Sequence, residues 1–419
     1  MNSEKISVRH WITIIASFCL SASIAFITTG FSFLIVPVTG DLGFEVAKFA
    51  LYFTFFMAFG LIGLPLWANI YKRIGVKWGV VISGALTTVF VVGLSFCHSL
   101  LSFYVMGAGI GLSFQGATVM PAVILINTWF IKKKGMILGI VMTGSGVGGA
   151  VLSYNFPKFL VTNTWQSAYL LLAACFCILC VPVALFLIKN KPADCGLQMY
   201  GWEEAQAAQA AQGGTGDATK QEAAGITLKE AWKTPHLYLL YGGVFVLSAV
   251  MSFSQYVPAH LTAIGVEVQT LAILTTILMV ANIVSKIIMG TLNDRLGVNT
   301  TLILVMALGL ASMFFFPRAG IFGLALIAVC LFPFGACFST VLPPLQTGAI
   351  FGNKDYTAIW GIMGTASTLG TAVGPPIWGA IFDANKSYVP GMYFSPILIV
   401  IGTVMCVVAV KTKSKLYPK

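Results

Sequence analysis

Long apolar segments follow one another along most of the chain, and they restrict its fold more than any other feature. Only 9% of the 419 residues are charged, whereas soluble domains carry about 25%. A helix of roughly 20 apolar residues crosses a bilayer, and only helices or closed barrels satisfy the backbone inside one. We therefore predict an all-α integral membrane protein with twelve transmembrane helices. The segments lie at about residues 11–37, 47–71, 77–97, 100–128, 135–160, 165–188, 237–263, 268–292, 299–316, 320–350, 355–382 and 389–411.

The basic residues predict how these helices are oriented. With both termini and the central loop on the cytoplasmic side, 19 of the 24 Lys and Arg residues face the cytoplasm and four face the other side. Such an excess in cytoplasmic loops is typical of membrane proteins. The net charge of +11 therefore reflects topology and does not indicate nucleic-acid binding. We expect a multi-pass protein of the cytoplasmic membrane that is surrounded by the lipid bilayer.

A polar interruption divides the twelve segments into six and six. Residues 189–235 contain the run EEAQAAQAAQGGTGDATKQEAAG, whose Ala/Gln/Gly-rich composition is typical of a flexible linker. We therefore predict an N-terminal six-helix bundle at 1–188, a cytoplasmic linker at 189–235 and a C-terminal six-helix bundle with a cytoplasmic tail at 236–419.

The two halves also repeat each other in sequence. Two separate stretches match at one constant offset of 222 residues, which chance does not readily produce. The matched pairs are Arg73/Arg295, Gly75/Gly297, Gly139/Gly361, Ile140/Ile362, Thr143/Thr365, Ser145/Ser367 and Gly148/Gly370. Two bundles of the same orientation are related by a pseudo-two-fold axis along the membrane normal. Transporters of this architecture bind substrate near the midplane of the bilayer.

One lysine lies inside an apolar segment. Lys286 precedes the charged turn at Asp294 by eight residues, or ~12 Å along a helix, and an ionisable group at that depth indicates a functional site. Every Asp and Glu lies in a tail, a loop or the end of a segment, so pairing of Lys286 with a membrane carboxylate is disfavoured. Asn282, one turn earlier, shares its helix face. We predict that Lys286 is the counter-charge of an anionic substrate.

The chain resembles the major facilitator superfamily in its twelve segments, its central loop and the turn Gly290-x-x-x-Asp294-Arg295-x-Gly297. The equivalent turn after the second segment is degenerate, with Ala68 in place of glycine and Lys72 in place of aspartate. The resemblance implies the major facilitator fold and a cytoplasmic charge latch formed by Asp294 and Arg295.

Small residues in the fifth segment form one helix face. Gly144 and Gly148 belong to it, and such faces allow close helix packing in membranes. We expect this face to pack tightly and to bend during transport.

A narrower resemblance is to the oxalate/formate antiporter and bacterial monocarboxylate transporter group. It rests on ITLKEAWKTPHLYLLY before the seventh helix and on NTWF followed by KKKG after the fourth. It implies that Lys286 stands where the group carries a substrate-pairing arginine, that Trp360 lines the site and that Thr28 and Thr29 touch substrate. The oxalate transporter's second cation is Met363 here. One cation suits a monovalent anion better than a dianion.

Further polar candidates lie near the outer end of the seventh segment. Gln255 and Tyr256 are candidates for the wall of the cavity. His260 either gates or links transport to a proton, or it only hydrogen-bonds at the boundary.

The resemblance also bears on how transport is coupled. Because Asn282 stands where proton-coupled relatives can carry a carboxylate, exchange or facilitated diffusion is favoured over proton symport.

These patterns together predict a secondary active or facilitative transporter of a small organic anion, most simply a monocarboxylate, that acts by alternating access as a monomer. Two alternatives remain: an exporter of drugs or lipophilic compounds, and a non-transporting membrane sensor on the same fold. No nucleotide-binding motif or catalytic triad is present, so we expect no enzyme and no cofactor. Cys175-x-Cys177-x-x-Cys180 does not place its thiols on one helix face, so no metal site is expected.

Overall fold

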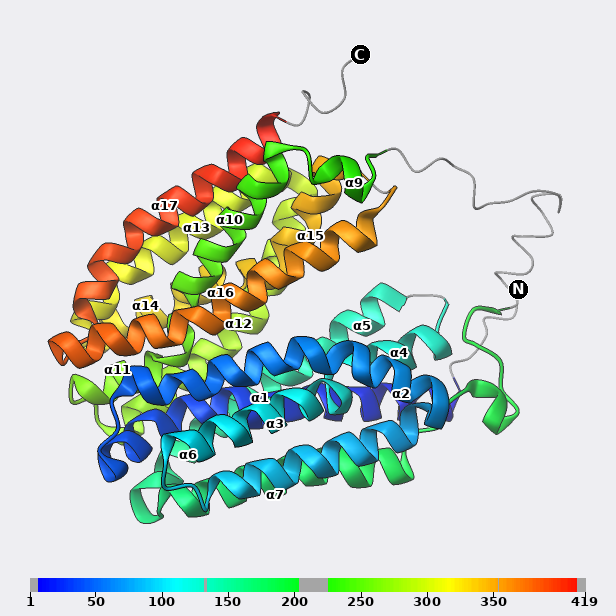
Figure 1. Cartoon of the computed structure of the whole chain (residues 1–419), viewed down its shortest axis with the longest axis horizontal. Coiled ribbons are helices and arrows are strands. Elements are labelled where there is room, and N and C mark those ends of the chain that lie inside the picture. The colour runs from blue at the N-terminus through cyan, green and yellow to red at the C-terminus, as the bar shows by residue number, and fades with distance from the viewer. Residues whose placement is uncertain (1–6, 132–133, 203–224, 353, 413–419) are drawn as a thin grey trace. The chain divides into compact units, whose positions relative to one another are not determined.

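The computed structural model describes residues 7–131, 134–202, 225–352 and 354–412, and these are almost entirely helical (Figure 1). Among them, β-structure is limited to isolated bridges that pair Phe130 with Tyr200 and Gly225 with Gly352. Eleven stretches of the described residues are long and apolar enough to cross a membrane. The twelfth predicted span corresponds to α16, a 30-residue helix whose Gly- and Thr-rich sequence is less apolar. The predicted all-helical membrane fold is confirmed.

In the first half of the chain, the described residues form seven helices because several spans are merged or divided. Helix α2 contains the second and third spans, joined at a kink at Gly75. The fourth span is divided into α3 and α4 at Thr118, and the fifth into α5 and α6 at Thr143. The helices are α1 (Val8–Leu42), α2 (Val46–Leu94), α3 (Leu100–Ala117), α4 (Val119–Trp129), α5 (Lys134–Met142), α6 (Gly144–Thr162) and α7 (Trp165–Phe186).

The second half begins with α9, a short helix capped by Thr227, and continues through the remaining spans. Short 3₁₀ turns, η2 (Ser252–Gln255) and η3 (Phe316–Arg318), lie near helix ends, and η1 (Pro192–Cys195) follows α7. The helices are α9 (Leu228–Ala231), α10 (Pro235–Met251), α11 (Val257–Ala263), α12 (Val268–Leu296), α13 (Val298–Phe315), α14 (Phe322–Ala336), α15 (Phe338–Phe351), α16 (Tyr356–Asn385) and α17 (Val389–Lys411).

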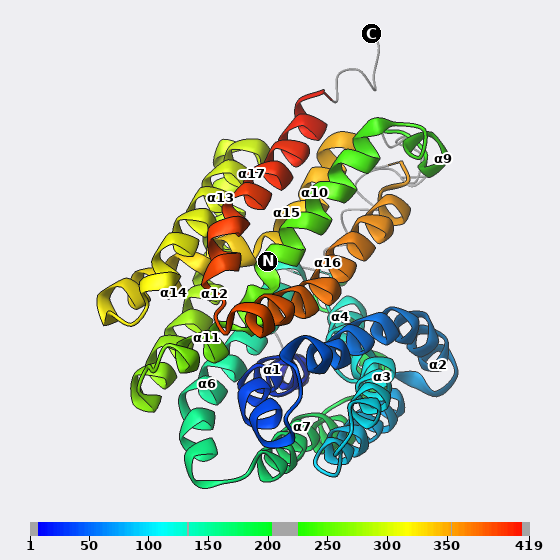
Figure 2. The ribbon, with the colours of Figure 1, turned by 60° about the vertical axis from the view of Figure 1, so that its left-hand side comes forward.

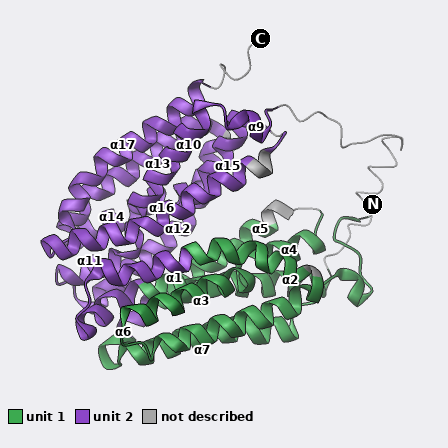
Figure 3. Ribbon diagram, in the orientation of Figure 1, with its two compact units in different colours: residues 1–31, 58–152, 159–218 green, residues 32–57, 153–158, 219–419 purple. Residues whose placement is uncertain are grey.

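The chain divides into two compact units (Figure 3). Unit 1 comprises residues 1–31, 58–152 and 159–218, and unit 2 comprises residues 32–57, 153–158 and 219–419. Unit 2 therefore contains the second-half helices together with one end each of α1 and α2 and a short part of α6. Within it, α10 packs against α16 and α17, while α13 packs against α14 and α17 (Figure 2).

The predicted internal repeat has a clear counterpart in the backbone. Gly75 has φ 79° and ψ 167°, and Gly297, 222 residues later, has φ 77° and ψ 165°. This region of backbone conformation is essentially restricted to glycine. The same unusual turn therefore joins two spans at the same place in each half of the chain.

Close helix packing is repeated as well. A Cβ atom added at Gly148 of α6 would lie 2.5 Å from the Ala22 carbonyl oxygen of α1, in unit 1. A Cβ atom added at Gly370 of α16 would lie 2.4 Å from the Phe245 carbonyl oxygen of α10, in unit 2. Both positions require glycine because the neighbouring backbone leaves no room for a side chain.

Candidate functional site

Lys286 lies on α12, in unit 2, and its side chain is half-buried. No described carboxylate lies within ion-pair distance of its ammonium group, whereas Lys48, for example, pairs with Glu45 at 3.0 Å. Asn282 lies one turn earlier on α12 and is also half-buried. The structure thus presents a partly exposed positive charge and an amide on adjacent turns of one helix.

The residue before Lys286 attaches α12 to its neighbours. Ser285 is fully buried, and its hydroxyl lies 3.0 Å from the Asn282 carbonyl oxygen and 3.3 Å from the Pro333 carbonyl oxygen of α14. The Sγ atom of Cys337 lies 3.1 Å from the same hydroxyl. Reasoning from the sequence missed Ser285 as a candidate, although its position beside Lys286 was visible there.

Cys337 occupies the junction at which the tenth span divides into α14 and α15. Its backbone N–H donates to the Pro333 carbonyl at 2.9 Å, and its Sγ lies 3.5 Å from the Asn282 carbonyl oxygen. Ser285, the residue next to Lys286, is in contact with this junction through the Cys337 Sγ atom. The counter-charge candidate therefore lies beside a break in a neighbouring spanning helix.

Trp360 lies near the start of α16 and is half-buried. On the same helix, a Cβ atom at Gly361 or Gly364 would meet nothing within 4 Å, so this part of α16 borders open space. Met363 is fully buried and does not take part in that open surface. Trp360 makes no ring contact with Lys286 among the described residues, so their joint role in one site stays a prediction.

Tyr256 and His260 use their polar atoms within unit 2. The Tyr256 hydroxyl donates to the Pro375 carbonyl of α16 at 2.8 Å, and His260 Nε2 lies 2.9 Å from the Phe316 carbonyl oxygen. Both side chains are buried. His260 contacts the rings of Phe253, Phe316 and Tyr388. Because both side chains are buried in this conformation, contact of either residue with substrate stays a prediction.

The remaining candidates divide between the two units. Gln255 ends η2 in unit 2 and is half-buried. Thr28 and Thr29 lie on α1 in unit 1, and the Thr28 hydroxyl donates to the Ile24 carbonyl at 3.0 Å. Substrate contact by these three residues stays a prediction.

The charged turn after α12 is described only in part. Arg295 and Gly297 are exposed, and Gly297 ends the helix. The surroundings of Gly290 and the side chain of Asp294 lie outside what the structure describes, so the latch between Asp294 and Arg295 stays a prediction. Gly144, like Gly148, contacts the α1 backbone: a Cβ atom there would lie 2.6 Å from the Phe18 carbonyl oxygen. Whether that face bends also stays a prediction.

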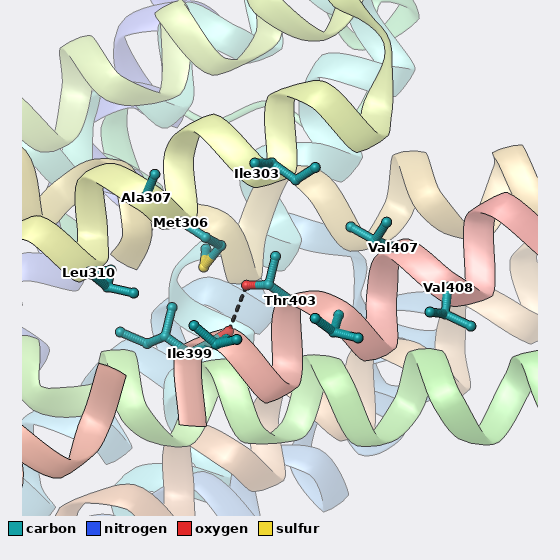
Figure 4. Close-up of a pocket in the computed structure, with 10 residues that line it drawn as sticks. Ile303, Met306, Ala307, Leu310, Ile399, Thr403, Val407 and Val408 are labelled. Atoms are coloured by element: carbon teal, nitrogen blue, oxygen red, sulfur yellow. Dashed lines mark hydrogen bonds between the residues drawn. The ribbon is translucent and has the colours of Figure 1, made fainter. Parts of the chain in front are cut away.

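Two apolar pockets of unit 2 do not include any predicted site residue. One, of about 340 Å³, lies between α13 and α17 (Figure 4); the other, of about 370 Å³, lies between α10, α16 and α17. Their hydroxyl groups are already used, because Thr403 donates to the Ile399 carbonyl and Ser395 to the Met392 carbonyl. These pockets fit hydrocarbon and offer nothing that binds an anion.

Comparison with known proteins places these features in context. The profile of the Major Facilitator Superfamily matches residues 15–350. Monocarboxylate transporter 12 of Xenopus laevis is 23% identical over 393 residues, which cover 92% of this chain and 85% of that protein. The Rattus norvegicus protein of the same name is 26% identical, over 80% of this chain and 73% of that one. An Agrobacterium vitis protein named "Putative tartrate transporter" is 24% identical, over 91% of this chain and 86% of that one.

Solved structures are similar to this chain in fold. A bacterial homolog of the human lysosomal transporter Spinster has a TM-score of 0.71 at 14% identity, covering 98% of this chain and 99% of that one. The nucleoside transporter NupG has a TM-score of 0.67 at 12% identity, covering 99% of this chain and 100% of that one. At these identities the likeness concerns the fold alone.

Proposed function

Because the chain belongs to the Major Facilitator Superfamily, and is therefore a membrane transporter rather than an enzyme, we propose that it carries a small organic anion across the cytoplasmic membrane. The favoured substrate is a monocarboxylate, moved by alternating access, with Lys286 as the substrate counter-charge. The observation that carries this proposal is the half-buried Lys286 on a spanning helix, without a carboxylate partner among the described residues.

The energetic argument for an anion is direct. A charged side chain within a membrane span costs about 2.5–3.5 kcal/mol on insertion scales, and burial without a partner disfavours the charged form. A carboxylate bound beside Lys286 would offset part of that cost. Asn282 on the same face can donate an amide N–H to the same carboxylate. Lysine offers a point charge rather than a planar fork, so it suits a single carboxylate without strict orientation.

Two observations support a monovalent anion over a dianion. The position that carries a second cation in the oxalate transporter is Met363, which is fully buried. Two of the relatives reported above are named as monocarboxylate transporters. The relative named for tartrate supports dicarboxylates, so both classes belong in any test.

The test is counterflow in proteoliposomes with a panel of acids from formate to aromatic monocarboxylates, together with tartrate and oxalate. Wild type is compared with Lys286→Ala and Lys286→Arg, and Lys233→Ala, an exposed lysine before α10, is the matched control. We expect exchange of at least one monocarboxylate by wild type and the control, loss in Lys286→Ala and partial retention in Lys286→Arg. No exchange of any acid by wild type, or full activity of Lys286→Ala, would refute the proposal.

The exporter of drugs or lipophilic compounds stays the alternative. The two apolar pockets do not decide between it and the anion carrier, because exposed side chains such as Val400 and Phe394 line them and membrane lipid fits such a surface equally well. Neutral and cationic lipophiles are therefore included in the panel. If they are transported, and Lys286→Ala transports them as well as wild type does, the exporter replaces the anion carrier.

A further inference from the structure

The Ser285 hydroxyl is one of the groups that hydrogen-bond α12 to the junction between α14 and α15. We propose that Ser285 is a positioning residue of the anion site: its hydroxyl fixes α12 against the junction at Cys337 and thereby sets where the Lys286 ammonium meets the substrate. This inference rests on the proposed function, because it requires that Lys286 binds an anion.

The contacts form a small closed network. The Ser285 hydroxyl lies 3.0 Å from the Asn282 carbonyl oxygen and 3.3 Å from that of Pro333, and 3.1 Å from Cys337 Sγ. Cys337 Sγ in turn lies 3.5 Å from the Asn282 carbonyl oxygen. Two donor hydrogens, one on oxygen and one on sulfur, thus meet two backbone carbonyl groups from two different helices.

The network includes the backbone that carries Lys286. In an α-helix the carbonyl of Asn282 accepts the N–H of the residue four positions later, which is Lys286. The same carbonyl therefore lies at the centre of the Ser285 and Cys337 contacts. The second helix contributes the Pro333 carbonyl, which also accepts the Cys337 N–H at 2.9 Å. A change in the bend at Cys337 would be transmitted through these contacts to the turn of α12 that presents Lys286.

A flexible lysine depends on such support more than a rigid side chain does. Its ammonium group is carried on a four-carbon stem, so the backbone beneath it must be held for the charge to occupy one position. Functional groups generally need supporting contacts that hold them within about 0.5 Å of their working geometry. Ser285 is fully buried, which is the arrangement expected of a residue that supports its neighbour rather than contacting substrate.

The test compares Ser285→Ala with a matched hydroxyl deletion on the same helix. Thr276 also lies on α12, but its hydroxyl donates at 2.7 Å to the Ala272 carbonyl of its own helix, so Thr276→Val removes a hydroxyl without detaching α12 from the junction. The readout is the concentration of the exchanged acid at half-maximal rate, measured separately from the maximal rate. We expect Ser285→Ala to raise the half-maximal concentration about five-fold, the effect of one lost hydrogen bond, with the maximal rate little changed. Thr276→Val should leave both values near wild type.

Variants at Cys337 keep the inference testable if Ser285→Ala folds poorly. Cys337→Ser keeps a donor and acceptor at the junction and should retain the wild-type half-maximal concentration, whereas Cys337→Ala should raise it. The double variant Ser285→Ala/Cys337→Ala should show less than the sum of the two effects, because contacting residues couple.

The outcomes separate this inference from the proposed function. If wild type exchanges no acid, the proposed function fails and this inference fails with it. If wild type exchanges an acid but Ser285→Ala and Thr276→Val have the same half-maximal concentration, Ser285 does not position Lys286, and the anion carrier stands. A fall in maximal rate and protein yield with an unchanged half-maximal concentration would likewise refute positioning, since it indicates a structural role only.

Discussion

Asp383 near the end of α16 holds the first turn of α2, and its replacement should loosen the contact between these helices. Its two carboxylate oxygens accept the N–H groups of Val46 at 3.0 Å and Ala47 at 2.8 Å. The first N–H groups of a helix have no partner within the helix, and a negative charge there also interacts favourably with the helix dipole. Residues 337 positions apart in the chain are thereby joined within unit 2.

Two further contacts join α2 to α16, and we call this boundary between the two helices the seam. The Thr54 hydroxyl donates to the Ala372 carbonyl of α16 at 2.6 Å, and a Cβ atom at Gly379 would lie 2.7 Å from the Ala47 Cα. On the predicted topology this seam lies on the outer side of the membrane. A transporter that opens to that side by alternating access would have to break it.

The size of the effect follows from these contacts. Loss of a capping side chain typically costs about 0.5–2 kcal/mol, and the dipole contributes about 0.3–1 kcal/mol. Asp383 is half-buried, so in Asp383→Ala water can bind part of the time to the N–H groups that the carboxylate held. We therefore expect this variant to weaken the seam by about 1.4 kcal/mol, which raises the population of molecules with an open seam about ten-fold. Asp383→Asn keeps one acceptor oxygen and should have a smaller effect.

The assay is labelling of Thr54→Cys in proteoliposomes by a membrane-impermeant maleimide, with and without Asp383→Ala. Background from the nine native cysteines is measured on the proteins that retain Thr54. The matched control is Asp355→Ala, because Asp355 near the other end of α16 accepts the Leu228 N–H of α9 at 2.8 Å. We expect an increase in labelling rate of about ten-fold for Asp383→Ala and none for the control. A rate within about two-fold of the parent would refute the role of Asp383 in this seam, because it falls well short of that factor of ten.

Other predictions concern glycine positions and one cap. Gly374→Ala should lower the midpoint of thermal unfolding in detergent, because its Cβ would lie 2.0 Å from the Ser252 hydroxyl oxygen, whereas Gly361→Ala, which meets open space on the same helix, should leave it unchanged or raise it. Alanine at Gly75 and alanine at Gly297 should each cost about 1–3 kcal/mol in unfolding free energy, because both require a backbone conformation restricted to glycine; equal stability to wild type would contradict this. Hydrogen bonds from the Thr227 backbone and hydroxyl lower the pKa of Glu230 below its usual value. Protection of the amides at the start of α9, measured by hydrogen exchange, should therefore be complete above the usual glutamate range and be lost as the pH falls through the lowered pKa. Glu230→Gln should remove that pH dependence.

The spanning helices and the repeat were predictable from the sequence because their causes are local. A segment is placed in the membrane by the sum of its own transfer free energies, so apolar composition alone predicted the helical membrane fold. The constant offset of 222 residues predicted a shared architecture, and Gly75 and Gly297 do have nearly identical backbone angles. Helix α16 is an exception, because its length and its place in the repeat indicate a span more clearly than its hydropathy does.

The partners of individual polar side chains were decided only by tertiary structure. Sequence identified Lys286 as unusual, but not that Ser285 beside it contacts Pro333 on another helix, nor that Asp383 caps a helix 337 residues away. It also left open the state of Tyr256 and His260, whose polar atoms contact backbone carbonyls of α16 and η3. Such contacts depend on how each helix is rotated and shifted against its neighbours. Because many rotations bury similar apolar area, hydropathy does not distinguish them, and close packing at positions such as Gly370 selects one.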